Sequence, residues 1–177
     1  MERRRLGRTG LEVSVLGFGG SEIGFERAEP GTVQRLLDEA LDAGLNVIDT
    51  AECYGDSESL IGRAVAGRRR DYHLLTKCGH YDGSGRDDWH PASLEKSIAR
   101  SLERLRTDHV DLLQLHTCSE EELRRGDVLE VLERAREGRR ASSATAATTP
   151  PRATPWTAGA STCSRRRSTW PITSRSR

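Results

Sequence analysis

The feature that most constrains the fold is a regular alternation of short apolar segments and amphipathic segments between residues 15 and 137. The first amphipathic segment has helical periodicity, since its apolar residues repeat at three- and four-residue intervals, at Val33, Leu36, Leu37, Ala40 and Leu41. Strands that alternate with helices predict a parallel sheet, because each helix must carry the chain back to the same edge. We therefore expect an α/β fold.

A hairpin and then four strand–helix pairs are predicted. A turn that contains glycine, within residues 3–13, predicts the hairpin. Pro91 stands at a first helical position, and glycines follow several of the expected helices. The expected strands cover residues 15–20, 46–49, 72–76 and 110–115, and the expected helices cover residues 33–41, 57–66, 91–105 and about 121–137.

The composition changes abruptly after residue 138. All 27 acidic residues of the chain lie before Gly138, whereas residues 139–177 contain eight arginines and a single aliphatic residue larger than alanine, Ile172. Such a segment cannot bury a core, so we expect a domain at 1–138 and a disordered, low-complexity tail at 139–177. The change interrupts the strand–helix alternation. This favours a break in the reading frame over an arginine-rich arm for nucleic acid, and no nucleic-acid partner is expected.

The composition also argues against several classes of protein. With 34% hydrophobic and 31% charged residues, the chain is typical of a globular domain, and no apolar run approaches the roughly 20 residues that span a bilayer. The N-terminus lacks the apolar stretch of a signal peptide. The four cysteines show neither CxxC spacing nor the density of a disulfide-rich domain. We therefore expect a cytoplasmic protein with thiols rather than disulfides, no membrane partner and no metal site.

Reactive side chains stand at the ends of successive predicted strands. Asp49, Lys77 and His116 each end a strand, and Tyr54 lies in the loop after the strand that Asp49 ends. Each residue taken alone has a structural explanation, such as a turn carboxylate, a loop aromatic or a surface lysine. However, the carboxyl ends of parallel strands meet at the edge of the sheet where ligands bind. Lys77 is also one of only two lysines in a chain rich in arginine. The four positions together predict a catalytic cluster.

The motifs around these residues resemble those of the aldo/keto reductase family. The family's D-T-A-x-x-Y-G element is similar to Asp49–Gly55 (DTAECYG), its lysine strand to Leu74–Lys77 (LLTK) and its histidine strand to Asp108–His116 (DHVDLLQLH). The segments Leu6–Gly10 and Val15–Gly20 resemble its hairpin and first-strand loop. The resemblance covers the whole of the predicted domain.

The resemblance implies the first half of a (β/α)8 TIM barrel and an NADPH-dependent reduction of an aldehyde or ketone to an alcohol. It assigns Asp49, Tyr54, Lys77 and His116 as the catalytic residues. Tyr54 would donate a proton to the carbonyl oxygen, with Lys77 stabilising the phenolate. Asp49 would orient Lys77, and His116 would hydrogen-bond the carbonyl oxygen. The choice between NADPH and NADH stays open.

The resemblance also places Gly19, Gly20 and Ser21, together with Asp49, along the NADP(H) cofactor. A missing side chain allows close approach of a ligand, which would account for the glycines. A Rossmann site is rejected, because Glu22 stands where the third glycine of G-x-G-x-x-G belongs and the next predicted helix begins about ten residues later. No cluster of His and Cys has the spacing of a metal site.

The predicted strands account for half of a barrel. A complete barrel needs eight strands and roughly 250 residues. The family's later strands supply the aromatic that stacks on the nicotinamide and the groups around the adenosine phosphate. We therefore expect a truncated, inactive part of a reductase for a small carbonyl compound. The alternative is a non-catalytic nicotinamide-binding or interaction module on the same fold. No oligomeric state is predicted.

Overall fold

The computed structural model describes residues 1–79, 89–138 and 140–148. Within these residues, an antiparallel hairpin of β1 (Arg3–Arg5) and β2 (Glu12–Ser14) precedes a parallel sheet in the order β3-β4-β5-β6-β7. The sequential order of the parallel strands confirms the predicted α/β fold. The strands of the sheet are β3 (Phe18–Gly19), β4 (Val47–Asp49), β5 (His73–Cys78), β6 (Val110–Cys118) and β7 (Ala141–Thr148).

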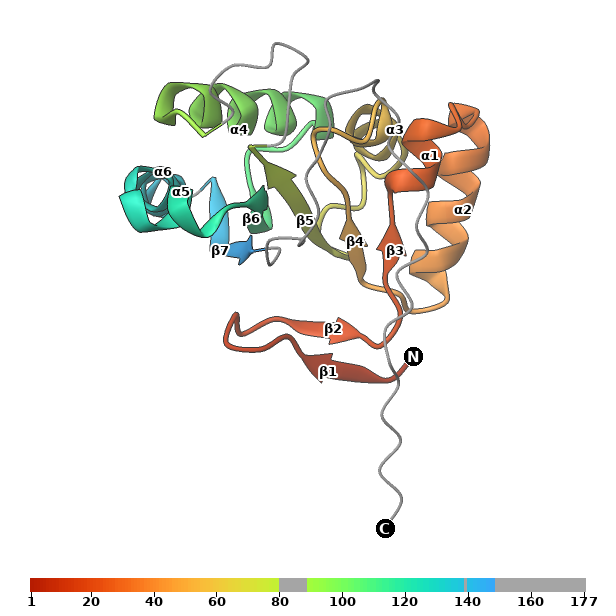
Figure 1. Ribbon diagram of the computed structural model, residues 1–177. Helices are drawn as coiled ribbons and strands as arrows, with labels where there is room; N and C mark the ends of the chain where they lie inside the picture. The colour runs from red at the N-terminus through yellow and green to blue at the C-terminus, as the bar shows by residue number, and fades with distance from the viewer. Residues whose placement is uncertain (80–88, 139, 149–177) are drawn as a thin grey trace, which may run out of the picture.

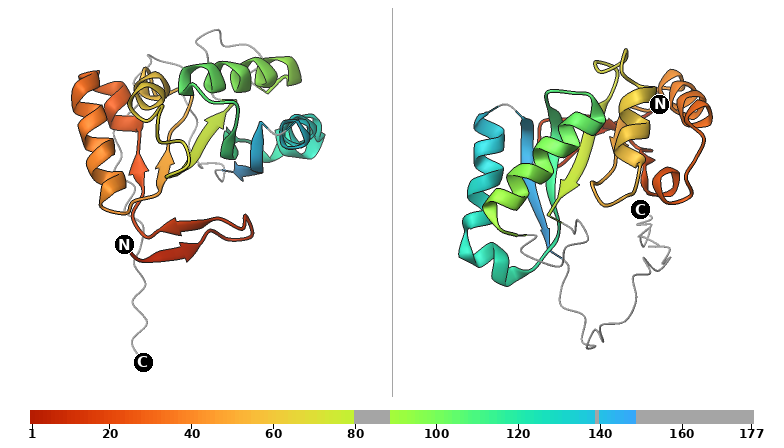
Figure 2. Two further views of the ribbon diagram at one scale, coloured as in Figure 1. Left: turned by 180° about the vertical axis from the view of Figure 1, so that it is seen from behind. Right: turned by 90° about the horizontal axis from the view of Figure 1, so that it is seen from above.

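Helices connect the strands and lie along one side of the sheet (Figures 1 and 2). Neighbouring helices contact one another, α2 against α3, α3 against α4 and α4 against α6. The hairpin lies beyond the amino ends of the strands (Figure 1). No helix among the described residues is long and apolar enough to cross a membrane. The helices are α1 (Ser21–Phe25), α2 (Pro30–Asp42), α3 (Ser57–Ala64), α4 (Pro91–Leu105), α5 (Glu120–Arg125) and α6 (Asp127–Glu137).

The core lies between the helices and one face of the sheet. Ile48, Leu74 and Leu113 on three adjacent strands are buried in the same apolar cluster as Leu37 of α2 and Leu94 of α4. Because side chains alternate along a strand, the residues next to these point to the other face of the sheet. That second face carries the polar residues predicted to be catalytic.

Asn46 anchors the hairpin to the sheet just before β4. Its side-chain Oδ1 accepts a hydrogen bond from the backbone N–H of Ser14 at 2.6 Å, and its own backbone N–H donates to Ser14 Oγ at 3.0 Å. The Asn46 amide nitrogen also donates to the carbonyl oxygen of Glu12 at 2.9 Å. Asn46 and Ser14 are both buried. The side chains of Asn46 and Ser14 therefore tie the hairpin to the parallel sheet.

The structure differs from the prediction after residue 138, because Ala141–Thr148 forms the strand β7 beside β6. The backbone N–H of Val110 donates to the carbonyl oxygen of Arg140 at 3.0 Å where the two strands begin to pair. Backbone groups of any residue type can extend an exposed sheet edge, so the segment needs no large apolar side chains to add a strand. The rest of the expected tail, residues 149–177, lies outside the described residues.

Other elements also differ from the prediction. The helix α1 begins directly after Gly20, so it was wrong to place the first helix about ten residues further on. With five residues, α1 is too short to show a periodic pattern. The strand expected at 15–20 is reduced to Phe18–Gly19. The helix expected at 121–137 is divided at Gly126 into α5 and α6. The rejection of a Rossmann site is supported by Glu22 and by the sequential strand order, which differs from the Rossmann order.

Candidate active site

The structure brings the four predicted catalytic residues together at the carboxyl edge of the sheet. Asp49 ends β4, Lys77 is the penultimate residue of β5, and His116 lies near the end of β6. Tyr54 lies in the loop between β4 and α3. The parallel register staggers these positions, since Asp49 pairs with Leu75, two residues before Lys77, and Lys77 pairs with Gln114, two residues before His116. The predicted convergence is therefore present in the folded chain.

Lys77 and Asp49 form the ion pair of this site. Lys77 Nζ donates to Asp49 Oδ2 at 2.6 Å and to the carbonyl oxygen of Thr50 at 2.9 Å. The Lys77 side chain is 16% exposed and the Asp49 side chain 41% exposed. Two hydrogen bonds thus hold the ammonium on the face of the sheet opposite the helices, while the Asp49 side chain stays partly open to solvent.

Gln114 is a site residue that the sequence analysis missed. It pairs with Lys77 in the register of β5 and β6, and its Nε2 donates to Asp49 Oδ1 at 3.4 Å. Asp49 therefore accepts hydrogen bonds from the adjacent strand β5 and from β6, the next strand beyond it. The sequence contained a signal, because Gln114 stands two residues before His116 in a strand and such residues share a face.

The rings of Tyr54 and His116 complete the cluster. Lys77 Nζ lies 5.3 Å from the centroid of the Tyr54 ring, which is within the range of a cation–π interaction. The Tyr54 and His116 rings meet edge to face, with their centroids 5.7 Å apart and their planes at 86°. The Tyr54 ring therefore contacts both the Lys77 ammonium and the His116 imidazole.

A bulge in β6 accompanies the position of His116. The register between β6 and β7 shifts between Leu115 and Cys118, and Thr117 adopts a left-handed φ of 60°. This conformation is unfavourable for a β-branched residue, and bulges often re-aim side chains next to functional sites. The strand pattern of the sequence carries no signal for this irregularity.

Cys53 is a second neighbour of His116 that the sequence analysis did not select. Its Sγ lies 3.3 Å from His116 Nδ1. Cys53 is partly exposed and directly precedes Tyr54. The β4–α3 loop therefore supplies both the phenol and a thiol to the same imidazole.

The short helix α1 supports the loop that carries Tyr54. A Cβ atom on Gly24 would overlap the backbone carbonyl of Tyr54, so the helix can approach the loop only with glycine there. Phe25 packs on the Tyr54 ring edge to face, with centroids 5.7 Å apart. The backbone N–H of Ser57 also donates to the Tyr54 carbonyl oxygen at 3.1 Å. The phenol is thus held from two sides.

The residues predicted to line the cofactor differ in their surroundings. A Cβ atom on Gly20 would lie 2.6 Å from Ser57 Oγ and 3.2 Å from Thr50 Oγ1, so packing alone already requires a glycine here. A Cβ atom on Gly19 would meet nothing within 4 Å, and Gly19 pairs with Asp49. Ser21 begins α1. The space beside Gly19 is therefore open, and the Asp49 side chain next to it is partly exposed.

A buried carboxyl group lies behind the site, on the helix side of β5. Thr76 Oγ1 donates to Glu58 Oε1 at 2.7 Å, and Arg104 Nη1 lies 3.7 Å from Glu58 Oε2. Glu58 is fully buried, and this burial raises the pKa of its carboxyl group above the ordinary value of 4.5. Thr76 directly precedes Lys77, so the contact braces the end of β5.

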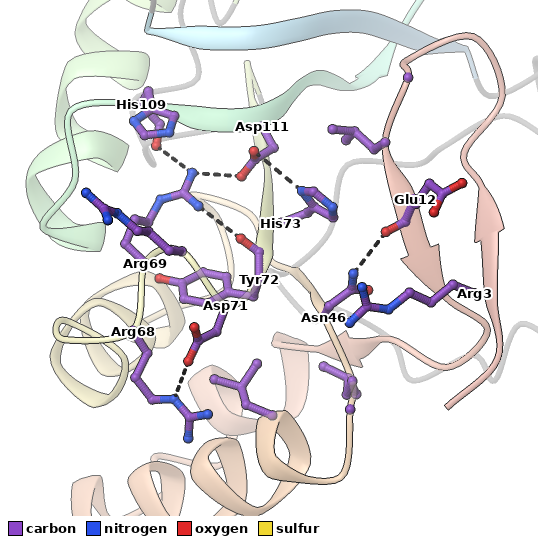
Figure 3. Close-up of a pocket in the computed structure, with 16 residues that line it drawn as sticks. Arg3, Glu12, Asn46, Arg68, Arg69, Asp71, Tyr72, His73, His109 and Asp111 are labelled. Carbon is purple, nitrogen blue, oxygen red and sulfur yellow. Dashed lines mark hydrogen bonds and ion pairs between the residues drawn. The ribbon is translucent and has the colours of Figure 1, made fainter.

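A cavity of about 870 Å³ lies at the opposite, amino edge of the sheet, between the hairpin and the sheet (Figure 3). Several of its polar groups pair with one another. Arg69 Nη2 lies 2.7 Å from Asp111 Oδ2, and the same oxygen accepts the backbone N–H of Leu74 at 2.8 Å. Arg68 Nε pairs with Asp71 at 2.9 Å. These contacts fasten the starts of β5 and β6, and none of the predicted site residues lines this cavity.

Comparisons with known proteins relate the chain to oxidoreductases. The sequence model of the aldo/keto reductase family matches residues 15–139. L-galactose dehydrogenase of Arabidopsis thaliana is 40% identical over 123 residues, which are 66% of this chain and 38% of that enzyme. The chain thus spans about two fifths of the length of the curated relatives it matches.

Solved structures agree with this relationship. An aldo-keto reductase from Bacillus halodurans, in its holo form, has a TM-score of 0.75 and 32% sequence identity, over 84% of this chain and 50% of that one. An aldo/keto reductase from Klebsiella pneumoniae in complex with NADP and acetate has a TM-score of 0.66 and 28% identity, over 77% of this chain and 46% of that one. The parallel sheet described here therefore corresponds to part of a TIM barrel.

Proposed function

Since this chain belongs to the aldo/keto reductase family, we propose that the carboxyl edge of its sheet is the catalytic part of an NADP(H)-dependent carbonyl reductase. The observation that carries the proposal is the contact of the Tyr54 ring with both the Lys77 ammonium and the His116 ring, together with the ion pair between Lys77 and Asp49. The substrate class is an aldehyde or ketone, and the product is the alcohol.

Proton delivery is the role proposed for Tyr54. Reduction of a carbonyl carbon leaves negative charge on the oxygen, which needs a proton donor and electrostatic stabilisation. The Lys77 ammonium, 5.3 Å from the Tyr54 ring centroid, stabilises the phenolate that forms when the proton leaves. The carboxylate of Asp49 holds the ammonium in this position through the 2.6 Å hydrogen bond.

Orientation of the carbonyl group is the role proposed for His116. One of its ring nitrogens, Nδ1, lies against Cys53 Sγ, so the other nitrogen is the one proposed to donate a hydrogen bond to the carbonyl oxygen. The edge-to-face contact with Tyr54 fixes the plane of the ring. The two donors then approach the same oxygen from different directions.

The open surface at Gly19 and Asp49 is where we propose that the nicotinamide ring lies. When bound, the nicotinamide supplies the hydride for reduction of the carbonyl carbon. Gly19 gives the ring room because no atom lies within 4 Å of its Cβ position, and Asp49 borders the same face. The NADP complex of the Klebsiella pneumoniae relative supports a nicotinamide cofactor.

An NADPH titration of the chain, combined with an activity assay of a chimera, tests the proposal. The chimera carries residues 1–138 in place of the matching part of the Bacillus halodurans reductase, so that it contains a whole barrel. We expect it to oxidise NADPH in the presence of an aldehyde, and we expect the 177-residue chain alone to show no turnover. A chimera that folds and binds NADPH without turnover would instead support a non-catalytic nicotinamide-binding module.

A further inference from the structure

The described cysteines differ sharply in their surroundings. Cys78 and Cys118 are buried, and burial raises the pKa of the Cys78 thiol to about 12 and that of the Cys118 thiol to about 11. Cys53 is partly exposed at the carboxyl edge of the sheet, and its Sγ lies 3.3 Å from a ring nitrogen of His116. Cys53 alone among these three combines access from solvent with an adjacent base.

We propose that Cys53 is a covalent modification site for α,β-unsaturated carbonyl compounds, with His116 as the base. This inference rests on the proposed function, because the carbonyl oxygen of the electrophile lies where the reductase substrate's oxygen lies. The thiolate is the attacking species in such additions, and an adjacent imidazole forms it by taking the thiol proton.

The addition balances without any further reactant. The Cys53 thiol proton passes to His116 Nδ1, and Sγ forms a bond to the β-carbon of the unsaturated carbonyl compound. The electrons of the carbon–carbon double bond move toward the carbonyl group, which becomes an enolate. The proton held by His116 then returns to the α-carbon, and the product is a saturated thioether of Cys53.

The surroundings favour a conjugated carbonyl over other soft electrophiles. The intermediate carries negative charge on the carbonyl oxygen, and the Lys77 ammonium lies 5.3 Å from the ring of the residue that follows Cys53. Alkyl halides and oxidants develop no such oxyanion, so the ammonium gives them no comparable stabilisation. A conjugated aldehyde is thus both a candidate substrate of this site and an agent that blocks it.

The experiment uses the full 177-residue chain with Cys163→Ser, which removes the cysteine outside the described residues. Crotonaldehyde, followed by borohydride to fix the adduct, and iodoacetamide are the two probes, and peptide mass spectrometry measures the rate at each cysteine. We expect Cys53 to react with iodoacetamide about tenfold faster than glutathione does. Cys78 and Cys118 are expected to react only after unfolding in urea.

Variants separate the roles of the neighbours. His116→Gln is expected to slow both reactions of Cys53 about tenfold, whereas His109→Gln, at the other end of β6, leaves them unchanged. Lys77→Met is expected to lower the ratio of the crotonaldehyde rate to the iodoacetamide rate. Circular dichroism checks that each variant is folded. If a variant does not fold, the reaction rates of Cys53, Cys78 and Cys118 in the chain that keeps His116 still test the proposal.

The proposal is overturned if Cys53 reacts no faster than glutathione or at the same rate as Cys78 and Cys118. A rate that does not respond to His116→Gln in a folded variant also overturns it. If Lys77→Met leaves the ratio of the crotonaldehyde rate to the iodoacetamide rate unchanged, the preference for conjugated carbonyl compounds is overturned. The proposed reductase function is judged separately, by NADPH binding and turnover of the chimera, so the two can fail independently.

Discussion

The ammonium of Lys77 lies 2.6 Å from the carboxylate of Asp49, although 28 residues separate them in the sequence. The two residues end adjacent parallel strands, so the contact follows from the order of β4 and β5 in the sheet. Lys77 faces the Tyr54 ring as well. The order of the strands therefore brings the two charged groups of the site together.

Replacement of Lys77 by methionine is expected to abolish most of the activity of the chimera. The phenolate of Tyr54 loses its nearest cation, and general acid catalysis contributes about 10²- to 10⁴-fold to such rates. We expect a fall of that size in kcat for NADPH-dependent aldehyde reduction. Lys96→Met provides the matched control, because Lys96 is the chain's other lysine and is exposed on α4. Equal activity of the two variants would contradict the role of Lys77.

Alanine substitutions at Gly19 and Gly20 are expected to affect different properties, NADPH binding at Gly19 and stability at Gly20. Gly20→Ala places a methyl group against Ser57 Oγ and Thr50 Oγ1, and overpacking of this kind costs about 1–3 kcal/mol of unfolding free energy. Gly19→Ala meets no neighbour and is expected to change stability by less than about 1 kcal/mol, but to weaken NADPH binding by the chimera. Urea unfolding and fluorescence titration measure the two quantities. A stable Gly20→Ala variant would show that α3 is not packed against this residue.

Glu58 is expected to make stability depend on pH. Burial raises the pKa of its carboxyl group in the folded chain above 4.5, so the folded state binds more protons than the unfolded state between pH 4.5 and that raised value. The contribution of Glu58 to the free energy of unfolding therefore falls as pH rises through this interval. Glu58→Gln stays neutral and keeps an acceptor for Thr76, and we expect the stability of this variant relative to the wild type to increase with pH.

Urea unfolding at a series of pH values from 4.5 to 8 measures this difference, starting at the ordinary pKa of Glu58. The matched control is Glu133→Gln, at an exposed position on α6. Parallel pH profiles for the wild type and Glu58→Gln would contradict a raised pKa at this residue.

Asn46→Ala is expected to release the hairpin. The substitution leaves the backbone N–H of Ser14 and the carbonyl oxygen of Glu12 without the Asn46 side chain, and an unsatisfied buried polar group costs about 1–3 kcal/mol. We expect a loss of stability in that range and faster hydrogen exchange at the Ser14 amide. If the Ser14 amide of Asn46→Ala exchanges as slowly as in the wild type, the Asn46 side chain is not what holds the hairpin.

Local patterns in the sequence were sufficient to predict the α/β class and most of its elements. The apolar repeat in α2 and the strand ends at Asp49 and Lys77 are short-range signals, because backbone periodicity decides which residues share a face. The motif that contains Tyr54 indicated the family for the same reason. Glu58 follows this motif by three residues, and the sequence gives no reason to expect its full burial.

Only the tertiary structure decided how these parts meet. It placed Cys53 and Gln114 in the site, showed that Gly20 is required for packing against α3, and added β7 from residues with little apolar character. These features depend on contacts between residues distant in the chain and on backbone hydrogen bonds at a sheet edge. Such contacts leave no periodic signal, since they are properties of the assembled sheet rather than of any one segment.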